Sequence, residues 1–425
     1  MTEQPEAYEL INSLLNLSGV KVVGIIDSPA NNKITIQVES TQSPINCRQC
    51  GKPTRPHGSA RTVTLRHLSL FGKETYIEIT PRRGRCDDCD GGMSTNETFD
   101  WYDPRSKMTK PYEQYLLFQL INSTVADVSR KEDVDYHAIE NLLDRHIEDE
   151  VDYDSIKALG VLGLDEISLK KGYRNFVTLI TYRIDGQVHI LGIVKGREKA
   201  DIQVFLKQIP RRLKKTVQAV CCDLYEGYIN AAKAIFKEKV PIVADRFHVK
   251  KLYHKALVTL RKAELKRLKK LLSIEEYAEL KPAIAILRKQ KDFFTEEEKP
   301  LIDKLFCISP KLKEAYAFSR ALSGMFDSDI TADEAKEKIA DWISNVEASD
   351  LKCFNTFIKT LSKHTNEISH YFISRNSSGF VEGFNNKVKV LKRRCYGLSN
   401  ITRLFKRLVL DTEGLNRYAP GMCAI

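Results

Sequence analysis

The chain has 425 residues, and its 67 lysines and arginines exceed its 56 aspartates and glutamates to give a formal net charge of +11. This length is too great for one compact core and predicts two to four domains. No run of 18 or more apolar residues occurs, so we expect no membrane span and a cytoplasmic protein. The positive charge is spread over several segments, which favours a polyanionic partner over a membrane surface.

Two cysteine pairs stand out in the first hundred residues. Cys47 and Cys50, and likewise Cys86 and Cys89, have the CxxC spacing of a tight metal-binding turn, and two such turns complete the tetrahedral four-sulfur site that structural zinc prefers. The runs KVVGIID, KITIQVES, TVTLRHLSL and ETYIEIT predict strands around and between the pairs. We therefore predict a β-rich zinc-binding module over residues 1–100. The alternative, reduced cysteines without a metal, does not account for the double pairing.

Three short helical segments come next, KPYEQYLLFQLIN, TVADVSRKED and DYHAIENLLDRHIED. Thr124 is a good N-cap for the second, with Asp127 three residues later, and the third begins near Asp135. Short helices with tight connections predict a helix-turn-helix DNA-binding domain over residues 105–150, whose last helix would enter a major groove. A generic three-helix packing unit has the same pattern.

The middle of the chain changes to alternating strands and helices. Three strand-like runs, with turns at Lys171-Gly172 and Asp185-Gly186, precede a helix (DIQVFLKQI), a strand (TVQAVCCD), a helix (INAAKAIFKE) and a fifth strand (VPIVADRFHVKKL). This is the element order of the ribonuclease H fold. We predict a multi-domain α/β protein with a ribonuclease H-like mixed sheet over residues 151–250, a helical insertion over 251–370 and the last part of the core over 371–425.

Acidic residues lie where two of these strands end. Asp165 ends VLGLDE and Asp223 ends QAVCCD, and the ribonuclease H order makes the two strands neighbours. A buried carboxylate is costly unless its charge is compensated, and a divalent cation is a usual compensation. With Glu382 from the final helix, three carboxylates could hold two Mg²⁺ or Mn²⁺ ions for in-line phosphoryl displacement. We predict that Asp165, Asp223 and Glu382 are the catalytic residues and the ligands of these ions.

Two other acids compete for the same role. Glu166 adjoins Asp165, but neighbours on a strand point to opposite faces of the sheet. Asp245 ends the fifth strand and is the alternative second ligand; otherwise we expect it to support the ligands from outside, together with His248.

The final helix contains a single acid, Glu382, beside a basic face. Helical spacing puts Glu382, Asn386, Lys389 and Arg393 on one side and an apolar stripe on the other. A solvated face over a buried stripe is the ordinary interpretation of such a pattern. Beside a metal-bound acid, however, cations would hold phosphates, so we predict DNA binding by Lys387, Lys389, Lys392, Arg393 and Arg394.

Four motifs resemble one known family. GLDEISLKKGYRNFVTLI, DLYEGYINAAKAIF, VADRFHVKKL and GFVEGFNNKVKVLKRRCYG, behind two CxxC pairs and a helix-turn-helix, are similar to the DDE transposases of the bacterial ISL-three insertion-sequence group. The resemblance implies a structural zinc module, a helix-turn-helix and a catalytic domain interrupted by helices before the last acid, and it gives Asp165, Asp223 and Glu382 as the acids. We therefore expect a transposase, bound as a homo-oligomer to terminal inverted repeats and target DNA near the bacterial nucleoid, that carries out metal-dependent strand cleavage and transfer.

Other classes of function use some of the same features. A DNA-binding regulator derived from a transposase would keep the zinc module and the helix-turn-helix but not need the three acids. A ribonuclease H-type nuclease would need the acids but not two DNA-binding modules ahead of them. A purely structural zinc scaffold would leave the strand-end carboxylates unexplained.

Overall fold

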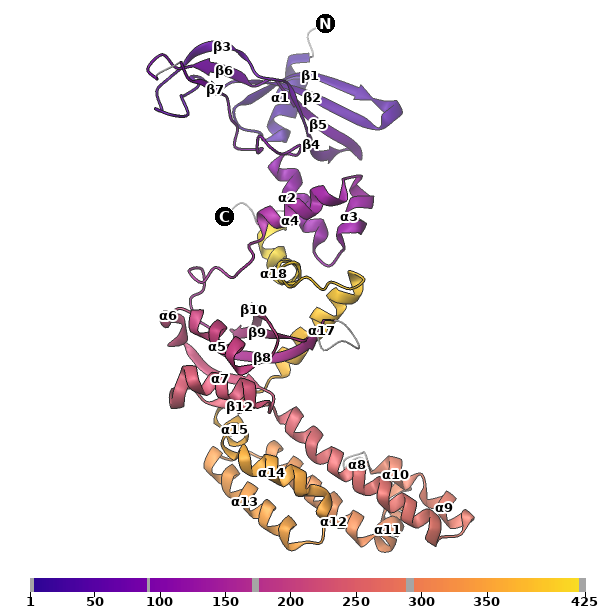
Figure 1. Ribbon diagram of the computed structural model, residues 1–425. Helices are drawn as coiled ribbons and strands as arrows, with labels where there is room; N and C mark the ends of the chain where they lie inside the picture. The colour runs from indigo at the N-terminus through magenta and orange to yellow at the C-terminus, as the bar shows by residue number, and fades with distance from the viewer. Residues whose placement is uncertain (1–3, 90–91, 170–175, 288–293, 420–425) are drawn as a thin grey trace. The chain divides into compact units, whose positions relative to one another are not determined.

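The computed structural model describes residues 4–89, 92–169, 176–287 and 294–419 (Figure 1). The chain divides into two compact units, Met1–Glu148 with Val409–Ile425, and Asp149–Leu408. The finer domain limits given above remain predictions. None of the described helices is long and apolar enough to cross a membrane.

The N-terminal part of the first unit is β-rich, as predicted. A four-stranded sheet has the order β1-β2-β5-β4 and buries Ile36, Leu65 and Ile77 on its core face. The helix α1 (Gln4–Leu15) was not predicted from the sequence; its Leu15 is buried whereas Leu10 and Leu14 are exposed, so apolar residues lie on more than one side of it. The strands of the sheet are β1 (Val20–Ser28), β2 (Lys33–Ser40), β4 (Val63–Leu70) and β5 (Lys73–Ile79).

A second, three-stranded sheet lies beside the cysteine pairs and consists of β3 (Arg55–Ser59), β6 (Arg82–Arg85) and β7 (Ser94–Asn96). A buried carboxylate ties it to the larger sheet. Glu97 accepts hydrogen bonds from Ser40 of β2 at 2.5 Å and from Arg82 of β6 at 2.7 Å. Burial by itself raises the pKa of Glu97, but the hydrogen bonds from Arg82 and Ser40 outweigh it, so the pKa is lowered and the group stays charged.

Three helices follow at the predicted places, α2 (Lys110–Leu120), α3 (Val125–Glu132) and α4 (Tyr136–His146). Both predicted caps form: the Thr124 hydroxyl accepts from the Asp127 N–H at 3.0 Å, and Asp135 accepts from the Ala138 N–H at 3.0 Å. The C-terminal helix α18 (Ile401–Tyr418) contributes to this unit as well, because its Asp411 accepts from the Asn122 N–H at 3.1 Å.

The second unit contains the predicted five-stranded mixed sheet, with the order β10-β9-β8-β11-β12. β8, β9 and β10 are antiparallel, and β11 runs parallel to both β8 and β12. Asp185 and Gly186 form the second predicted turn with positive φ angles of 49° and 77°, whereas Lys171-Gly172 lies outside the described residues. The strands and the main crossover helices are β8 (Gly160–Ser168), β9 (Phe176–Ile184), β10 (Gln187–Lys195), α5 (Lys199–Gln208), β11 (Val217–Cys222), α7 (Glu226–Phe236) and β12 (Ile242–Ala244).

The predicted continuation of the fifth strand through RFHVKKL is wrong. β12 has three residues, and the Asp245 side chain accepts from the Phe247 N–H at 3.1 Å, so it caps the 26-residue helix α8 (Arg246–Leu271). A carboxylate at the N-cap position satisfies a free backbone donor and begins a helix where alternation alone suggested a strand.

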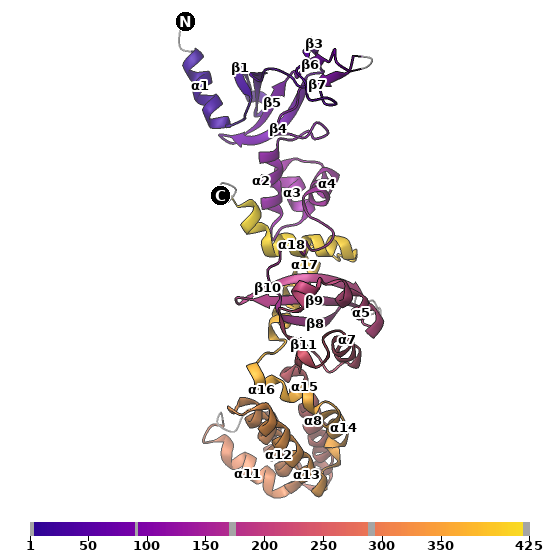
Figure 2. The same cartoon turned by 90° about the vertical axis from the view of Figure 1, so that its left-hand side faces the viewer.

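α8 opens the helical insertion, in which α8, α12, α13 and α14 pack side by side (Figure 2). Trp342 of α13 lies at the centre of its core, in edge-to-face contact with Phe354 and Phe357. The remaining described helices of the insertion are α9 (Ile274–Leu280), α10 (Ala283–Ile286), α11 (Glu298–Ile308), α12 (Pro310–Asp327), α13 (Ala332–Ala348), α14 (Asn355–Lys363), α15 (Thr365–Ser369) and α16 (Tyr371–Ser374).

The helix α17 (Gly379–Arg394) then returns to the sheet and packs against β8. Gly163 allows this close approach, because a Cβ atom at that position would lie 2.3 Å from Val381 Cγ2. The buried side of α17 contains the predicted stripe of Val381, Phe384, Val388 and Leu391.

Candidate functional site

Asp165 and Asp223 lie at the same end of two neighbouring strands in the five-stranded sheet. β8 and β11 pair in parallel with Leu164 opposite Cys222, and each aspartate is the next residue along its strand. Residues paired in this way point to the same face of a sheet. The structure therefore brings the two aspartates together, as the strand order predicted.

The electrostatics of the two carboxylates reflect this proximity. Burial raises the pKa of the Asp165 carboxyl, and the charge of Asp223 adds to the rise, although the Glu166 N–H donates to Asp165 at 2.8 Å. Burial also raises the pKa of Asp223, opposed by a hydrogen bond from the Tyr225 N–H and by the charge of His248. Two half-buried acids that repel each other form a site in which a divalent cation would be stabilised.

Glu382 lies in the first turn of α17 and is exposed. α17 reaches the aspartates through its next turn, because Asn385 Nδ2 donates to Asp165 Oδ2 at 2.6 Å. This contact was not predicted, since nothing in the sequence indicates which residue a helical asparagine faces. Among the described residues, Glu382 does not join Asp165 and Asp223 in a group with ligand atoms within 4.8 Å of one another.

The other predicted acids have partners of their own. Glu166 accepts from Arg197 at 2.8 Å. Asp245 follows Ala244 of β12, which pairs with Cys222, so it lies beside Asp223 at the same end of the sheet. Its carboxylate caps α8. His248, one turn into α8, lies with its Nδ1 4.0 Å from Asp223 Oδ2.

The basic residues of α17 divide into two groups. Lys389 and Arg393 are exposed on the side of Glu382, as the helical spacing predicted, whereas Lys387 and Arg394 are half-buried. Lys392 is half-buried too, and its ammonium donates to the backbone carbonyl of Ser168 at 2.5 Å, which ties α17 to the end of β8.

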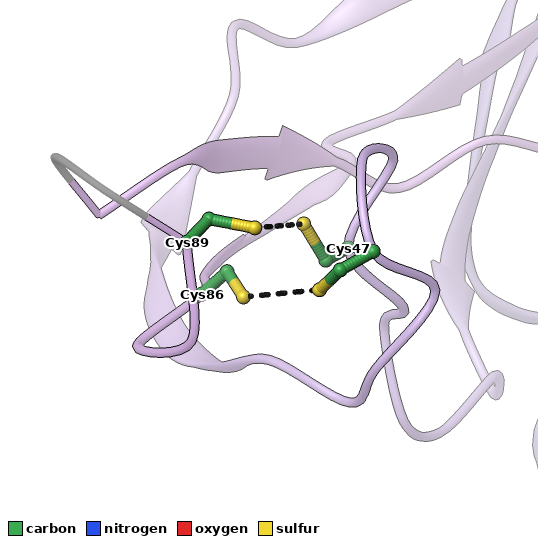
Figure 3. A group of neighbouring side chains, drawn as sticks. Cys47, Cys86 and Cys89 are labelled. Carbon is green, nitrogen blue, oxygen red and sulfur yellow. Dashed lines mark hydrogen bonds between the residues drawn. The ribbon is translucent and has the colours of Figure 1, made fainter.

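The four paired cysteines converge on one point in the first unit (Figure 3). Their sulfur atoms lie within 4.8 Å of one another, with 3.8 Å between Cys47 and Cys89 and 3.5 Å between Cys50 and Cys86. Four sulfurs bound tetrahedrally to zinc at about 2.3 Å are about 3.8 Å apart. The donor set and its geometry therefore fit zinc.

The charges of the cysteine cluster fit a metal as well. Hydrogen bonds from the backbone N–H groups of Cys50 and Gln49 lower the pKa of Cys47 to about 6. The pKa of Cys89 is raised to about 12, first through its hydrogen bond with Cys50 and then through desolvation, since sulfurs this close cannot all be anionic without compensation. A bound dication supplies that compensation.

A ribonuclease H-like sheet with paired acids at one edge, preceded by a three-helix unit and a four-cysteine centre, defines a class of DNA-processing enzymes. Residues 162–408 match a transposase domain of the DDE type in family ISL3, which is more than half of the chain. Residues 97–147 match the helix-turn-helix domain of transposase family ISL3, and residues 43–89 match the zinc-finger of the IS204/IS1001/IS1096/IS1165 transposases. The chain belongs to transposase family ISL3, and it is a DNA-binding transposase with a zinc ribbon.

Curated relatives of the chain are transposases for insertion sequence elements. The transposase for insertion sequence element IS1001 of Bordetella parapertussis is 24% identical over 391 residues, covering 92% of this chain and 94% of the relative. The transposase for insertion sequence element IS1557 of Mycobacterium tuberculosis is 21% identical over 279 residues, covering 61% of this chain and 62% of the relative.

Proposed function

We propose that this transposase binds the terminal inverted repeats of an insertion sequence and cuts and joins DNA with Asp165, Asp223 and Glu382, which hold Mg²⁺ or Mn²⁺. The observation that carries the proposal is the register of β8 and β11, which makes the two aspartates neighbours at one edge of the sheet. Glu382 contributes from the first turn of the helix that packs on β8.

The donor set suits a hard divalent cation, because carboxylate oxygens are its preferred ligands. Burial raises the pKa of both aspartates, and a bound cation would favour their charged forms. Such a cation, when bound, lowers the pKa of an attacking water or 3′-hydroxyl and stabilises the leaving oxygen. Asp165 and Asp223 would hold the cation between them, and the charge of His248, whose Nδ1 lies 4.0 Å from Asp223 Oδ2, favours the ionised form of Asp223.

The DNA near the cut lies, in this proposal, along α17. Lys389 and Arg393 follow Glu382 by two and three turns on one exposed face, so they would contact consecutive phosphates beside the acids. Lys387, Lys392 and Arg394 are less exposed and would strengthen the positive potential from behind this face.

The helix α8 extends this basic surface. Five exposed lysines lie within one narrow stripe of the helix that also contains His248, at i, i+4, i+11, i+15 and i+18. Within the described part of the chain these lysines form no ion pair, and Glu264, the acid of this helix, is buried against Arg267. We propose that duplex leaving the catalytic acids follows this lysine stripe, Lys251, Lys255, Lys262, Lys266 and Lys269.

Recognition of the element ends is assigned to the first unit. In α4 the first two turns expose His137 and Asn141, and Lys131 is exposed in the last turn of α3. The N-terminal residues of a recognition helix contact base edges, and asparagine pairs well with adenine. Because an element has two ends, we propose that a homo-oligomer brings them together on the DNA of the nucleoid.

The test mixes the purified chain and Mg²⁺ with duplexes that carry the element's own ends, and follows nicking at the repeat boundary. Boundary nicks and joined products support a transposase. Specific binding without nicking, in Mg²⁺ or Mn²⁺, would indicate a regulator. Cleavage of the RNA strand of a hybrid, without preference for the ends, would indicate a ribonuclease H-type enzyme.

A further inference from the structure

Asn385 is a polar residue in the apolar side of α17. It is 5% exposed, and the buried residues around it on the helix are Val381, Phe384, Val388 and Leu391. A leucine would suit this position if packing were its only role. The amide therefore calls for a chemical explanation.

The amide nitrogen of Asn385 has a hydrogen-bond partner and the amide oxygen has none among the described residues. Nδ2 donates to Asp165 Oδ2 at 2.6 Å, whereas Oδ1 is buried and has no hydrogen-bond partner among the described residues. An ionised carboxylate accepts hydrogen bonds only, so the NH₂ group must face Asp165 and the oxygen cannot take its place. A buried acceptor left without a donor is destabilising, so a native structure retains one where something else supplies the donor.

The location indicates which donor is missing. Asn385 touches Asp165, whose neighbour along the sheet is Asp223, and it follows Glu382 by three residues, hence on the adjoining part of the helix surface. Mg²⁺ and Mn²⁺ at carboxylate sites keep several waters in their coordination shell, and each of these waters is a strong donor. Partners of this kind, which orient a ligand and contact the shell around the metal, are a regular part of metal sites.

We propose that Asn385 is a positioning residue of the catalytic metal site: its NH₂ holds the Asp165 carboxylate, and its oxygen accepts a hydrogen bond from a water of the bound cation. The proposal rests on the proposed function, because it assumes a divalent cation between the acids. The proposal gives a function to the turn of α17 that contains Asn385, between Glu382 and the cations Lys389 and Arg393.

The test measures metal affinity directly, with DNA left out. Mn²⁺ is titrated into the full-length zinc-loaded chain, and free Mn²⁺ is followed by its electron paramagnetic resonance signal. Removing such a partner weakens metal binding by about 10- to 100-fold, so we expect Asn385→Ala to bind Mn²⁺ that much more weakly than the wild type. Asn345→Ala, an exposed asparagine on α13, is the matched control and should bind like the wild type.

A second variant keeps the shape of the side chain. Asn385→Asp places a carboxylate beside Asp165, so without metal the two charges repel and the melting temperature of the second unit should fall. If the free end of the side chain faces the hydrated cation, Mn²⁺ should restore the loss and raise the melting temperature of Asn385→Asp by more than it raises that of the wild type. An equal rise in both proteins would overturn the inference, even if Asn385→Ala failed to fold.

The outcomes separate this inference from the proposed function. If the wild type binds Mn²⁺, Asp165→Asn abolishes binding and folded Asn385→Ala binds as tightly as the wild type, then Asn385 has no part in the site although the site exists. If the wild type itself binds no Mn²⁺, both the metal site of the proposed function and the role of Asn385 are wrong.

Discussion

Asp165 and Asp223 are neighbours across two parallel strands, each one residue beyond the register pair of Leu164 and Cys222. Asp245 directly follows β12, one residue beyond Ala244, which pairs with Cys222. Each of the three carboxylates accepts a backbone hydrogen bond, from the N–H groups of Glu166, Tyr225 and Phe247 respectively, and burial raises the pKa of Asp165 and of Asp223. Asp165 and Asp223 remain the proposed metal ligands, because α17, the helix that contains Glu382, contacts Asp165 through Asn385.

The first prediction concerns these acids. Asp165→Asn, Asp223→Asn and Glu382→Gln keep the shape of each side chain and remove the charge that the cation needs, so each should lower the rate of DNA cleavage by at least about a thousandfold. Binding to element ends, measured by fluorescence anisotropy, should not change. Because burial raises the pKa of both aspartates, the Asn variants should melt at the wild-type temperature or above it in the absence of divalent metal.

Two further variants complete this experiment. Asp341→Asn changes an exposed acid of α13 and should leave cleavage intact. Asp245→Asn preserves the helix cap, because asparagine caps as well as aspartate. If Asp245→Asn abolished cleavage in folded protein while Asp223→Asn remained active, the second ligand would belong to β12 and not to β11.

The second prediction concerns the zinc centre. The Cys47→Ser, Cys86→Ser double variant removes one sulfur from each turn, so metal analysis of the purified chain should fall from one zinc per chain to none. The first unit should then lose its cooperative unfolding transition, since metal binding to such a centre contributes directly to folding. Cys307→Ser, at an exposed cysteine of α11, is the control and should retain the zinc. A reduced wild-type chain that carries no metal would contradict the assignment.

Much of this architecture could be predicted from the sequence, because its signals are local. Alternating apolar residues predicted β1, β2, β4 and β5, and the caps at Thr124 and Asp135 predicted where α3 and α4 begin. What could not be predicted depends on contacts between distant parts of the chain. Nothing in the sequence around Asn385 indicates that it meets Asp165, 220 residues away, and nothing near Lys392 indicates that its ammonium donates to the Ser168 carbonyl.

The third prediction uses the lysine stripe of α8. Each phosphate contact contributes about 0.9 to the slope of log K against log salt concentration. Changing Lys262, Lys266 and Lys269 together to glutamine should therefore reduce the slope by about 2.7 for binding to a duplex of arbitrary sequence. The matched control changes Lys299, Lys304 and Lys311, which already pair with Glu296, Glu279 and Asp350. An equal change of slope in both triple variants would show that net charge alone, and not the stripe, determines binding.

The fourth prediction concerns sequence recognition. Asn141→Ala removes an exposed amide from the first turns of α4 and should reduce the preference for element ends over unrelated duplex by about 1–3 kcal/mol. Its affinity for unrelated duplex should not change, because that affinity comes from phosphate contacts. Lys131→Gln, in contrast, should weaken binding to both duplexes alike. If Asn141→Ala kept the full preference, recognition would have to reside elsewhere in the first unit or in the catalytic unit.

The last prediction concerns a buried ion pair that holds the helix-turn-helix together. Glu113 of α2 is 2% exposed and accepts hydrogen bonds from Arg145 at 2.8 Å and His146 at 3.0 Å, both on α4. Burial alone would raise the pKa of Glu113, but the hydrogen bonds from His146, Ser106 and Arg145 outweigh it and lower the pKa from 4.5 to about 2. The stabilisation is therefore complete above the unfolded-state pKa of 4.5 and is lost as the pH falls towards 2, and its full size is about 3 kcal/mol.

The chain allows a clean measurement, because it has two tryptophans and Trp342→Phe leaves Trp101 of the first unit as the reporter. In that background Glu113→Gln should lower the free energy of unfolding at pH 7 by about 3 kcal/mol, and the difference from the parent should shrink steadily below pH 4.5. Comparing the two proteins at each pH cancels contributions that they share, such as the release of zinc in acid. Glu148→Gln, an exposed carboxylate just after α4, should stay within about 0.5 kcal/mol of the parent at every pH. A difference between Glu113→Gln and the parent that did not vary with pH would mean that packing of the side chain, and not its charge, stabilises the contact between α2 and α4.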